Sequence, residues 1–332
     1  MLNGKTVLVT GGTGSFGHRF ASYVLEHYRP KKLIIYSRDE FKQFNMANAY
    51  REYAKNMRFF IGDVRDESRL RRALNGVDYV IHAAALKQVP SCEYNPMEAI
   101  RTNVDGAMNV INTSLDTGVK KVVALSTDKA VSPINLYGST KMVSDKLFAA
   151  ANAYSGENGT RFAIVRYGNV AGSRGSVIPF FQELVKQGKR ELPITDFRMT
   201  RFWISLTQGV QLVIKALEEA RGGETFVSKI PSFKVTDLAQ AILPGCEMKE
   251  VGIREGEKLH EVMVSAEDAM RTCEYEKHYI IYPHYDWWNS EKVIPGGKPV
   301  DPGFIYSSDK NAQWLSVDDI TRLLKTDIEH HE

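Results

Sequence analysis

Residues 5–17 read KTVLVTGGTGSFG, and this stretch decides the fold class. The apolar run Lys5–Thr10 is short and rich in branched residues, which is typical of a strand buried on both faces. Gly11, Gly14 and Gly17 follow it directly, where a helix would begin. Glycines let the backbone turn tightly and let a pyrophosphate approach, and the amino terminus of a helix offers unpaired N–H groups. The stretch therefore predicts a nucleotide-binding strand–turn–helix unit.

Strand-like and helical stretches alternate through the residues that follow. Short runs rich in branched or aromatic residues predict strands at Lys5–Thr10, Lys32–Tyr36, Arg58–Ile61, Tyr79–His82, Lys121–Leu125 and Arg161–Val165. Longer stretches between them predict helices at Phe16–Tyr28, Asp66–Leu74, Pro96–Thr117 and Leu136–Tyr154. This alternation is typical of an α/β fold with a Rossmann doubly wound parallel sheet.

The alternation breaks after Gly168, where turn residues and short elements take over. A smaller C-terminal substrate lobe is therefore expected to close over the carboxyl edge of the sheet. A short helix is expected near residues 316–325, because Ser316 and Asp319 have capping-box-like spacing. We divide the chain into a Rossmann domain at residues 1–168, a mainly substrate-binding lobe at residues 169–290 and a tail at residues 291–332. Elements of the lobe can interleave with the sheet.

The charge composition bears on the class of partner. The 332 residues include 43 Lys+Arg interspersed with 40 Asp+Glu, for a net charge of +3. So small an excess does not indicate nucleic-acid binding, and any anionic partner must be held by a local arrangement of groups. A small phosphorylated substrate suits this better than a polymer.

Signals for membranes, secretion and metals are missing from the sequence. No apolar run approaches the roughly 20 residues of a membrane span, and four residues before the first expected strand leave no room for a signal peptide. A cytoplasmic protein is expected, with its three cysteines as reduced thiols. No metal is expected, because HExxH and CxxC do not occur and His278 and His284 lack ligand spacing. His82 ends a strand and is expected to pack rather than react.

The end of the second expected strand indicates which dinucleotide binds. An acidic residue there would bond the ribose hydroxyls of NAD. This chain has Ser37 and Arg38 instead, which can pair with the 2′-phosphate of NADP. NADP is favoured, although Asp39 and Glu40 follow at once and keep NAD open. The other expected cofactor contacts lie in the glycine turn and after the third and fourth strands, at Gly11, Thr13, Gly14, Ser15, Phe16, Gly17, Asp63, Val64, Ala83 and Ala84.

A Tyr–Lys pair follows the fifth expected strand. Tyr137 and Lys141 are four residues apart on an expected helix, so their side chains share a face. An ammonium near a phenol favours the phenolate and lowers the tyrosine pKa from about 10 towards neutrality. Such a tyrosine can take a hydroxyl proton while hydride leaves the carbon, and the lysine can bond the nicotinamide ribose. Asp128 and Lys129, just before this pair, can supply a second acid and base.

These motifs together resemble a known family. TGGTGSFG, STDK and YGSTK are similar to motifs of the extended short-chain dehydrogenase/reductases, and here they occupy residues 10–17, 126–129 and 137–141. Longer runs resemble the inverting UDP-N-acetylglucosamine 4,6-dehydratases of bacterial surface-sugar biosynthesis, at residues 59–66, 82–104, 126–141, 166–181 and 254–263.

The resemblance implies a dehydration that inverts carbon 5 of the hexose. Oxidation at carbon 4 makes the carbon 5 proton acidic, water leaves across carbons 5 and 6, and hydride returns to carbon 6. NADP would stay tightly bound and be regenerated in each turnover. Tyr137, assisted by Lys141, would serve the hydride step, while Asp128 would be the acid at carbon 6 and Lys129 the base at carbon 5, two roles that could be exchanged. As a base Lys129 must be neutral, which requires desolvation or the nearby charge of Lys141.

The same resemblance implies further contacts and partners. A homo-oligomer is expected, with UDP-N-acetylglucosamine as substrate and a product that leads to a pseudaminic-acid-like sugar for flagellin or surface glycans. Asn103 would support the active-site backbone, and Lys87 would touch both cofactor and sugar. The substrate contacts implied are Lys87, Thr127, Asn169, Arg254 and Glu257.

Two alternatives stay open at this point. A nucleotide-sugar 4-epimerase or ketoreductase would share the glycine turn and the pair Tyr137 and Lys141, but it has no evident use for Asp128 and Lys129. A sensor or scaffold that binds NADP without catalysis could dispense with Tyr137 and Lys141, so their presence argues against it. Retaining dehydratases usually have Asp-Glu where this chain has Asp128-Lys129, so the expected inversion depends on Lys129.

Overall fold

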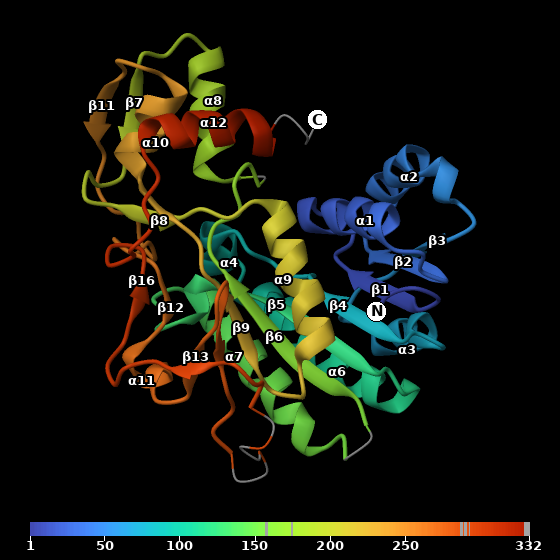
Figure 1. Cartoon of the computed structure of the whole chain (residues 1–332). Helices are drawn as coiled ribbons and strands as arrows, with labels where there is room; N and C mark the ends of the chain where they lie inside the picture. The colour runs from blue at the N-terminus through green and yellow to red at the C-terminus, as the bar shows by residue number, and fades with distance from the viewer. Residues whose placement is uncertain (157–158, 174, 286–287, 289–290, 292, 329–332) are drawn as a thin grey trace.

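A computed structural model describes residues 1–156, 159–173, 175–285, 288, 291 and 293–328 (Figure 1). Its main sheet has the strand order β15-β13-β14-β9-β6-β5-β4-β1-β2-β3. The parallel part consists of β1 (Thr6–Thr10), β2 (Lys32–Ser37), β3 (Met57–Ile61), β4 (Tyr79–His82), β5 (Lys121–Thr127), β6 (Arg161–Tyr167) and β9 (Thr225–Ser228). The order 3-2-1-4-5-6 of the first six strands is that of a doubly wound dinucleotide-binding sheet, which confirms the predicted fold class.

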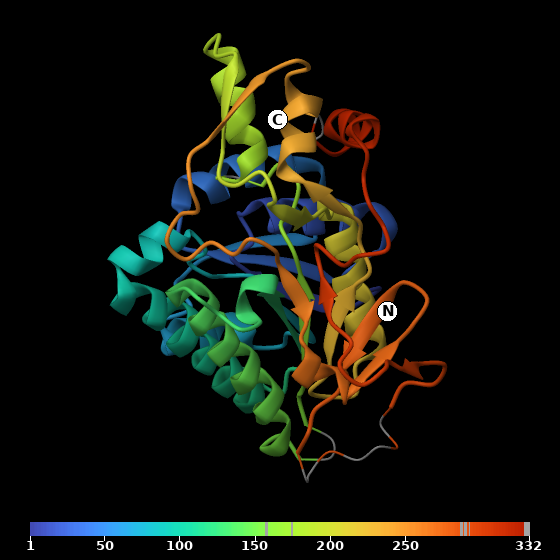
Figure 2. The ribbon, with the colours of Figure 1, turned by 90° about the vertical axis from the view of Figure 1, so that its left-hand side faces the viewer.

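Helices cover both faces of this sheet and create two hydrophobic cores. Successive side chains of a strand point to opposite faces, so Val7 and Val9 of β1 enter one core and Leu8 enters the other. The first core lies under α1 (Ser15–His27) and α9 (Leu206–Glu219). The second lies under α3 (Glu67–Leu74), α6 (Gly106–Thr117) and α7 (Leu136–Ala150), as Figures 1 and 2 show.

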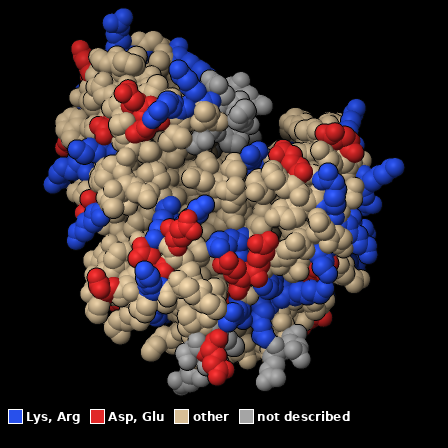
Figure 3. Space-filling model, viewed as in Figure 1, with Lys and Arg blue, Asp and Glu red and all other residues tan. Residues whose placement is uncertain are grey.

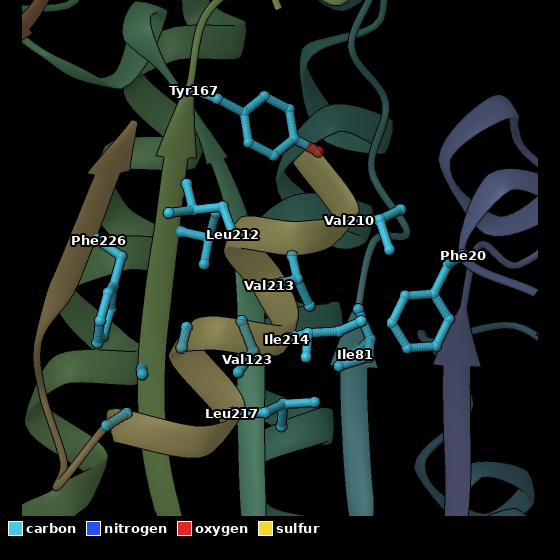
Figure 4. Close-up of a cluster of buried hydrophobic side chains, with 14 of the residues drawn as sticks. Phe20, Ile81, Val123, Tyr167, Val210, Leu212, Val213, Ile214, Leu217 and Phe226 are labelled. Carbon is cyan, nitrogen blue, oxygen red and sulfur yellow. The ribbon is translucent and has the colours of Figure 1, made fainter. Parts of the chain in front are cut away.

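Helix α9 illustrates how the sheet is held. A capping box between Ser205 and Gln208 starts the helix. Its apolar face then places side chains such as Val213 and Leu217 toward Val123 of β5 (Figure 4). Each such side chain contributes about 1.5–3 kcal/mol when it is fully buried. The first core therefore holds in place the strands whose carboxyl ends line the ligand-binding edge of the sheet.

A smaller lobe with its own core stands at one end of the sheet, at the upper left of Figure 1. It contains α8 (Val177–Lys186), β7 (Glu191–Ile194), α10 (Val235–Ile242), β11 (Glu247–Glu250) and α12 (Val317–Ile328). The predicted terminal helix is confirmed as α12. The Ser316 and Asp319 side chains each accept a hydrogen bond from the backbone N–H of the other residue, which completes the capping box.

Short strands connect this lobe to the sheet. They form two antiparallel pairs, β8 (Thr200–Phe202) with β10 (Ser232–Lys234) and β12 (Val262–Val264) with β16 (Tyr306–Ser307). The short helix α11 (Ala266–Ala269) follows β12. Downstream residues also extend the main sheet through β14 (His278–Ile281), β13 (Thr272–Glu274) and β15 (Lys298–Pro299). The boundaries at residues 168 and 290 stay a prediction, and elements from both sides of each boundary meet in one sheet.

The helices also differ in detail from the sequence expectation. The stretch predicted as one helix from Pro96 to Thr117 consists of α5 (Pro96–Ile100), a π-helical turn at Arg101–Asp105 and then α6. Two further helices, α2 (Glu40–Ala49) and α4 (Val89–Tyr94), were not predicted, since their apolar residues show no clear periodicity. None of the helices that the structure describes combines the length and apolar character needed to cross a bilayer.

Candidate active site

A cleft of about 1030 Å³ lies along the carboxyl edge of the parallel strands, between the sheet and the smaller lobe. In open α/β sheets this edge is where ligands bind. Most of the predicted site residues line it, and they come from the ends of seven strands or from the segments that follow them: Gly11, Thr13, Gly14, Ser15, Phe16, Ser37, Arg38, Asp63, Val64, Ala83, Ala84, Lys87, Thr127, Lys129, Tyr137, Lys141, Asn169, Arg254 and Glu257. Gly17 and Asp128 are not part of its lining, for different reasons given below.

The glycine turn after β1 is shaped by close backbone contacts. Gly11 has a φ of 64°, and a Cβ there would lie 2.8 Å from the Cα of Ala84. A Cβ on Gly17 would lie 2.1 Å from the carbonyl oxygen of Gly12. Gly17 therefore serves the packing of α1 against the turn, whereas Gly11 keeps the turn close to the strand β4 edge. Helix α1 begins with Gly14 as N-cap and without a side-chain cap, so its first N–H groups face the cleft.

Polar groups meet at the end of β2. The Ser37 hydroxyl accepts a hydrogen bond from Thr13 at 3.2 Å, and Arg38 lies 3.6 Å from the Asp63 carboxylate. Asp39 caps α2 by accepting a hydrogen bond from the Lys42 N–H at 2.9 Å. Backbone and side-chain hydrogen bonds from Lys42 lower the pKa of Asp39. Lys42 also lines the cleft, and the sequence analysis missed it as a cation on this side.

The loop after β4 is braced from two sides. The Thr10 hydroxyl accepts hydrogen bonds from the N–H groups of Ala83 and Ala84, each at 3.2 Å. Asn103 accepts from the Leu86 N–H at 2.8 Å and donates to the Leu86 carbonyl at 2.9 Å. The predicted support by Asn103 is confirmed, and the π-helical turn carries this side chain, as such turns often do at functional sites.

Helix α7 delivers Tyr137 and Lys141. The Asn135 side chain caps α7 by accepting from the Gly138 N–H at 2.7 Å, so Tyr137 stands in the first turn. A Cβ on Gly138 would lie 2.1 Å from the Lys129 carbonyl oxygen, which shows how closely α7 packs on the Asp128–Ala130 turn. Both Tyr137 and Lys141 are buried and line the cleft, as their shared helix face predicted.

The predicted lowering of the Tyr137 pKa is wrong for the structure. Burial raises the pKa of Tyr137 to about 12, and it outweighs the opposing effects of Lys129 and of the Thr127 hydroxyl. Lys129, rather than Lys141, is the cation that acts on the phenol. Burial lowers the pKa of Lys141, while the carboxylate of Asp145 works against that change.

Lys129 lies at the centre of a charge cluster. Its Nζ donates to Asp128 Oδ1 at 3.2 Å, to Asn169 Oδ1 at 3.1 Å and to Glu261 Oε1 at 3.2 Å. Arg201 completes the cluster, with its Nε 3.7 Å from Glu261 Oε1. Asp128 is fully buried beneath the cleft, which explains its absence from the lining, and its Oδ1 accepts a hydrogen bond from Thr127 at 2.9 Å.

The protonation states in this cluster differ from the sequence expectation. Burial works to lower the pKa of Lys129, but the charges of Asp128 and Glu261 outweigh it and raise that pKa. The condition that Lys129 be neutral is therefore not met by desolvation, and Lys141 does not contribute to it. Burial, and then the charge of Glu261, also raise the pKa of Asp128. For a carboxyl group a raised pKa favours the neutral, protonated form, whereas for Lys129 it favours the charged form. A protonated Asp128 suits the predicted role of an acid.

Two members of the cluster, Glu261 and Arg201, were not predicted. Glu261 lies in the REGEKLHEVM stretch, where the sequence analysis selected Arg254 and Glu257 instead. The only signal for Glu261 in the sequence is a carboxylate that precedes a short apolar run. Nothing in its spacing connects it with Lys129, 132 residues away. Arg201 lies in β8, a strand of three residues.

The loop that carries Arg254 and Glu257 closes the cleft from the lobe side. The Glu257 N–H donates to the Arg254 carbonyl at 3.1 Å, which makes a tight turn. Asn135 donates to the Gly256 carbonyl at 2.7 Å and so ties this turn to the start of α7. The structure therefore brings these two residues to the same cleft as Tyr137.

None of the histidines that the structure describes lines the cleft. His82 is buried, packs against Phe148 and shares a hydrogen bond of 2.9 Å with Thr10, which confirms the expectation that it packs. Within the described ranges, no group of three or more His, Cys, Asp or Glu is arranged to hold a metal ion.

The fold and the cleft define a class of protein. A doubly wound sheet with a glycine turn, a buried Tyr–Lys pair after β5 and a lobe over the carboxyl edge describe an enzyme of the extended short-chain dehydrogenase/reductase type. Residues 7–283 match the family of polysaccharide biosynthesis proteins, and the chain belongs to that family.

Curated relatives span almost the whole chain. It is 55% identical over 322 residues to an inverting UDP-N-acetylglucosamine 4,6-dehydratase of Campylobacter jejuni strain 81-176, covering 95% of this chain and 96% of the relative. It is 43% identical over 330 residues to a UDP-glucose 4-epimerase of Rickettsia canadensis, covering 97% and 96%. The resemblance that the motifs indicated is confirmed.

Solved structures share the fold. Pen from Bacillus thuringiensis has a TM-score of 0.88 at 36% identity, covering 98% of each chain. The dTDP-glucose 4,6-dehydratase DesIV of Streptomyces venezuelae, solved with NAD bound, has a TM-score of 0.69 at 25% identity, covering 76% of this chain and 86% of that one.

Proposed function

We propose that this chain is an inverting UDP-N-acetylglucosamine 4,6-dehydratase. The observation that carries the proposal is the pair Asp128 and Lys129, held at 3.2 Å in the region of the cleft that also receives Tyr137. Elimination of water needs an acid and a base in addition to the Tyr–Lys pair, and this pair provides both groups. The 55% identity to the Campylobacter jejuni enzyme supports the same reaction.

The cofactor side of the cleft fits a dinucleotide. A Cβ at Gly11 would fill the space against Ala84, and the open first turn of α1 offers N–H groups to a pyrophosphate. We propose that Gly11, Thr13, Gly14, Ser15 and Phe16 hold the pyrophosphate region, with Asp63, Val64, Ala83 and Ala84 beside the adenine and ribose. An oxidised nicotinamide, when bound, accepts hydride and adds a positive charge that favours the Tyr137 phenolate.

NADP, rather than NAD, is the dinucleotide that we propose. Arg38 and Lys42 both line the cleft past the end of β2, where a 2′-phosphate would lie. The nearby carboxylate of Asp39 is already engaged by the Lys42 N–H and ammonium. Asp39, whose carboxylate could have favoured NAD, therefore acts as the N-cap of α2.

The residues divide the work of the proposed reaction. Tyr137 takes the proton of the carbon 4 hydroxyl, while Lys141 and Thr127 orient the phenol and the carbon 4 oxygen. Lys129 then removes the proton from carbon 5, and Asp128 gives its proton to the departing carbon 6 hydroxyl. Because Lys129 donates to Asp128 at 3.2 Å, a proton shift along this bond produces the neutral amine and the neutral acid together.

The substrate contacts stay a prediction supported by position. Lys87, Asn169, Arg254 and Glu257 all line the cleft. Arg254 is exposed and can pair with a diphosphate, whereas Asn169 lies within reach of both Lys129 and a sugar. The cytoplasmic location and the later use of the product in a pseudaminic-acid-like sugar also stay predictions.

A homo-oligomer is part of the proposal. Exposed apolar side chains gather on neighbouring helices α4, α5 and α7, and they include Tyr94, Met97, Met142 and Val143. By contrast, acidic and basic groups are intermixed over the face shown in Figure 3. Sedimentation equilibrium of the purified chain measures the oligomeric state, and a monomer at micromolar concentration would contradict this part of the proposal.

The decisive experiment is proton NMR of the purified protein with UDP-N-acetylglucosamine in heavy water. We expect a new 6-deoxy methyl signal, deuterium at carbon 5 and inverted configuration there. Retained configuration would keep the dehydratase and overturn the stereochemical role of Lys129. An unchanged spectrum from folded, cofactor-loaded protein would overturn the dehydratase.

A 4-epimerase is the second candidate, because relatives named UDP-glucose 4-epimerase match the chain at 43% identity over 330 residues. Such an enzyme would give a product inverted at carbon 4 that keeps its carbon 6 hydroxyl. The same spectra distinguish the two, since an epimerised sugar shows no 6-deoxy methyl signal.

A further inference from the structure

The carboxylate of Glu261 has no part in the roles assigned above, although it contacts the proposed base. It lies just before β12, and its side chain is 2% exposed. Its Oε1 accepts from Lys129 Nζ at 3.2 Å, and its backbone N–H donates to the Ser308 hydroxyl at 2.9 Å. The Ser308 hydroxyl in turn lies 2.7 Å from Thr200 Oγ1, so β8 and the residue directly after β16 both hold Glu261 in place.

A buried carboxylate is costly unless it is paired, so this position demands a reason. Arg201 lies 3.7 Å away and balances the charge of Glu261. Burial works to raise the pKa of Glu261, but Lys129 and Arg201 outweigh it and keep the group ionised. Its second oxygen has no hydrogen-bond partner among the described residues, and Glu261 lines the cleft.

We propose that Glu261 is a positioning residue for the acid–base step, which holds Lys129 against Asp128 and sets the pH range in which that pair shares one proton. The inference rests on the proposed dehydratase and deepens it. Elimination breaks the carbon 5–hydrogen bond, whose proton goes to Lys129 and whose electrons form the carbon 5–carbon 6 double bond. The carbon 6–oxygen bond breaks, and the Asp128 proton completes the water that leaves.

After this step Asp128 is a carboxylate and Lys129 an ammonium, joined by the 3.2 Å hydrogen bond. When hydride returns to carbon 6, Lys129 gives its proton to carbon 5, and Asp128 regains a proton in place of the one that Tyr137 took from the carbon 4 hydroxyl. Elimination leaves the net charge of the cluster unchanged, so the fixed pair of Glu261 and Arg201 is suited to a step in which Asp128 and Lys129 change charge together. A negative charge beside the two groups raises the pKa of each.

Other charged groups face the cluster from the surrounding elements. Lys258, from the loop before β12, acts on Glu261, and Tyr137 of α7 acts on Lys129. Lys87, from the loop after β4, and Lys129 act on one another. These groups remain unchanged in a Glu261 variant, so a shift in the pH profile of that variant reports on the single charge removed.

The test is the pH dependence of kcat for Glu261→Gln, measured by the NMR assay on the cofactor-loaded enzyme. Loss of one negative charge should move both limbs of the profile to lower pH by about one unit. Glu261→Asp keeps the charge, so its limbs should stay in place even where kcat falls. Glu267→Gln, on the exposed surface of α11, is the matched control and should change nothing.

Arg201→Gln provides a variant of opposite sign, since Arg201 lowers the pKa of Lys129. Both limbs of the pH profile of this variant should move to higher pH. The inference therefore stays testable if Glu261→Gln does not fold. A fall in kcat at every pH with unmoved limbs in both variants would overturn the inference and leave Glu261 with a structural role.

A second readout separates this inference from the proposed function. Competitive acetylation of lysines across a pH series, read by mass spectrometry, reports the pKa of Lys129 without turnover. In Glu261→Gln, Lys129 should become reactive at a pH about one unit lower than in the unmodified protein. A wild type without dehydratase activity would overturn the proposed function, whereas unchanged Lys129 labelling would overturn the role of Glu261.

Discussion

The glycine turn and the charge cluster belong to one cleft, yet they are assembled in different ways. The turn consists of consecutive residues between Gly11 and Gly17, whose conformation follows from backbone contacts within the turn and with Ala84. The cluster joins Lys129 to Asn169 and Glu261, across 40 and 132 residues of sequence. Its members meet because Lys129 and Asn169 follow the neighbouring strands β5 and β6, while Glu261 reaches the same place from the segment just before β12.

This difference decides how each region responds to change. The turn depends on the absence of side chains, so an added methyl group disturbs it wherever the contact is short. The cluster depends on mutual charge, so removal of one member changes the protonation of the others. Variants in the two regions separate the two kinds of dependence.

Lys129→Met should give the largest effect. Loss of the base at carbon 5 is expected to reduce kcat by about a thousandfold or more. Oxidation at carbon 4 should be slower, because the variant loses the Lys129 charge that lowers the Tyr137 pKa, but it should continue because Tyr137 and Lys141 are still present. Reduced cofactor should therefore accumulate and be visible by absorbance. Tyr137→Phe is the control that should abolish both signals. Full turnover by Lys129→Met would remove the cluster from the mechanism.

His278 should control the stability of the fold in acid. A variant at this position therefore distinguishes acid unfolding from protonation of the charge cluster. The ring stacks between Phe226 and Tyr275, and neither ring nitrogen has a partner among the described residues. Burial lowers the pKa of His278 to about 4. The pKa of His278 in the folded protein lies below the unfolded value of about 6.5. The stability that the neutral ring contributes is therefore fully present above about pH 6.5 and is lost as the pH falls towards 4, by about 3 kcal/mol in all.

The measurement is urea unfolding of His278→Phe across this pH range. The phenylalanine ring should keep the stacking and flatten the decline of unfolding free energy between pH 6.5 and 4. An equally steep decline in the variant would show that other groups control acid stability. With this variant as background, acid loss of activity can be assigned to the cluster rather than to unfolding.

Gly17→Ala tests the turn. A Cβ there meets the Gly12 carbonyl oxygen at 2.1 Å, so the backbone must shift, and we expect a loss of about 2 kcal/mol in unfolding free energy with weaker dinucleotide binding. Gly209→Ala, in α9, is the matched control, since its Cβ would lie 3.8 Å from the Tyr167 ring. That change should be neutral or slightly stabilising. Equal melting temperatures for the two variants would contradict the tight packing of the turn.

Arg38→Ala should have the smallest effect and tests the choice of cofactor. Loss of a charge-assisted contact to a 2′-phosphate should weaken NADP binding about tenfold and leave NAD binding nearly unchanged. Isothermal titration with both dinucleotides measures this, and Arg51→Ala, on the exposed side beyond α2, is the control. Equal weakening for NADP and NAD would disprove recognition of the 2′-phosphate by Arg38.

Local sequence determined much of this protein. The alternation of strands and helices, the glycine turn, and the spacing of Tyr137 and Lys141 all depend on residues close in sequence, and the fold class follows from them. Asp128 and Lys129 could also be selected, since they directly follow the strand β5 that ends at the cleft.

Only the tertiary structure decided the electrostatics. Whether Lys129 or Asp128 carries a proton depends on burial and on Glu261, and the sequence spacing between these residues holds no trace of their contact. The same reason explains the wrong expectation for the Tyr137 pKa, where burial outweighs the neighbouring cations. Covalent spacing fixes which side chains share a helix face, but the charge state of a buried group is set by every element that surrounds it.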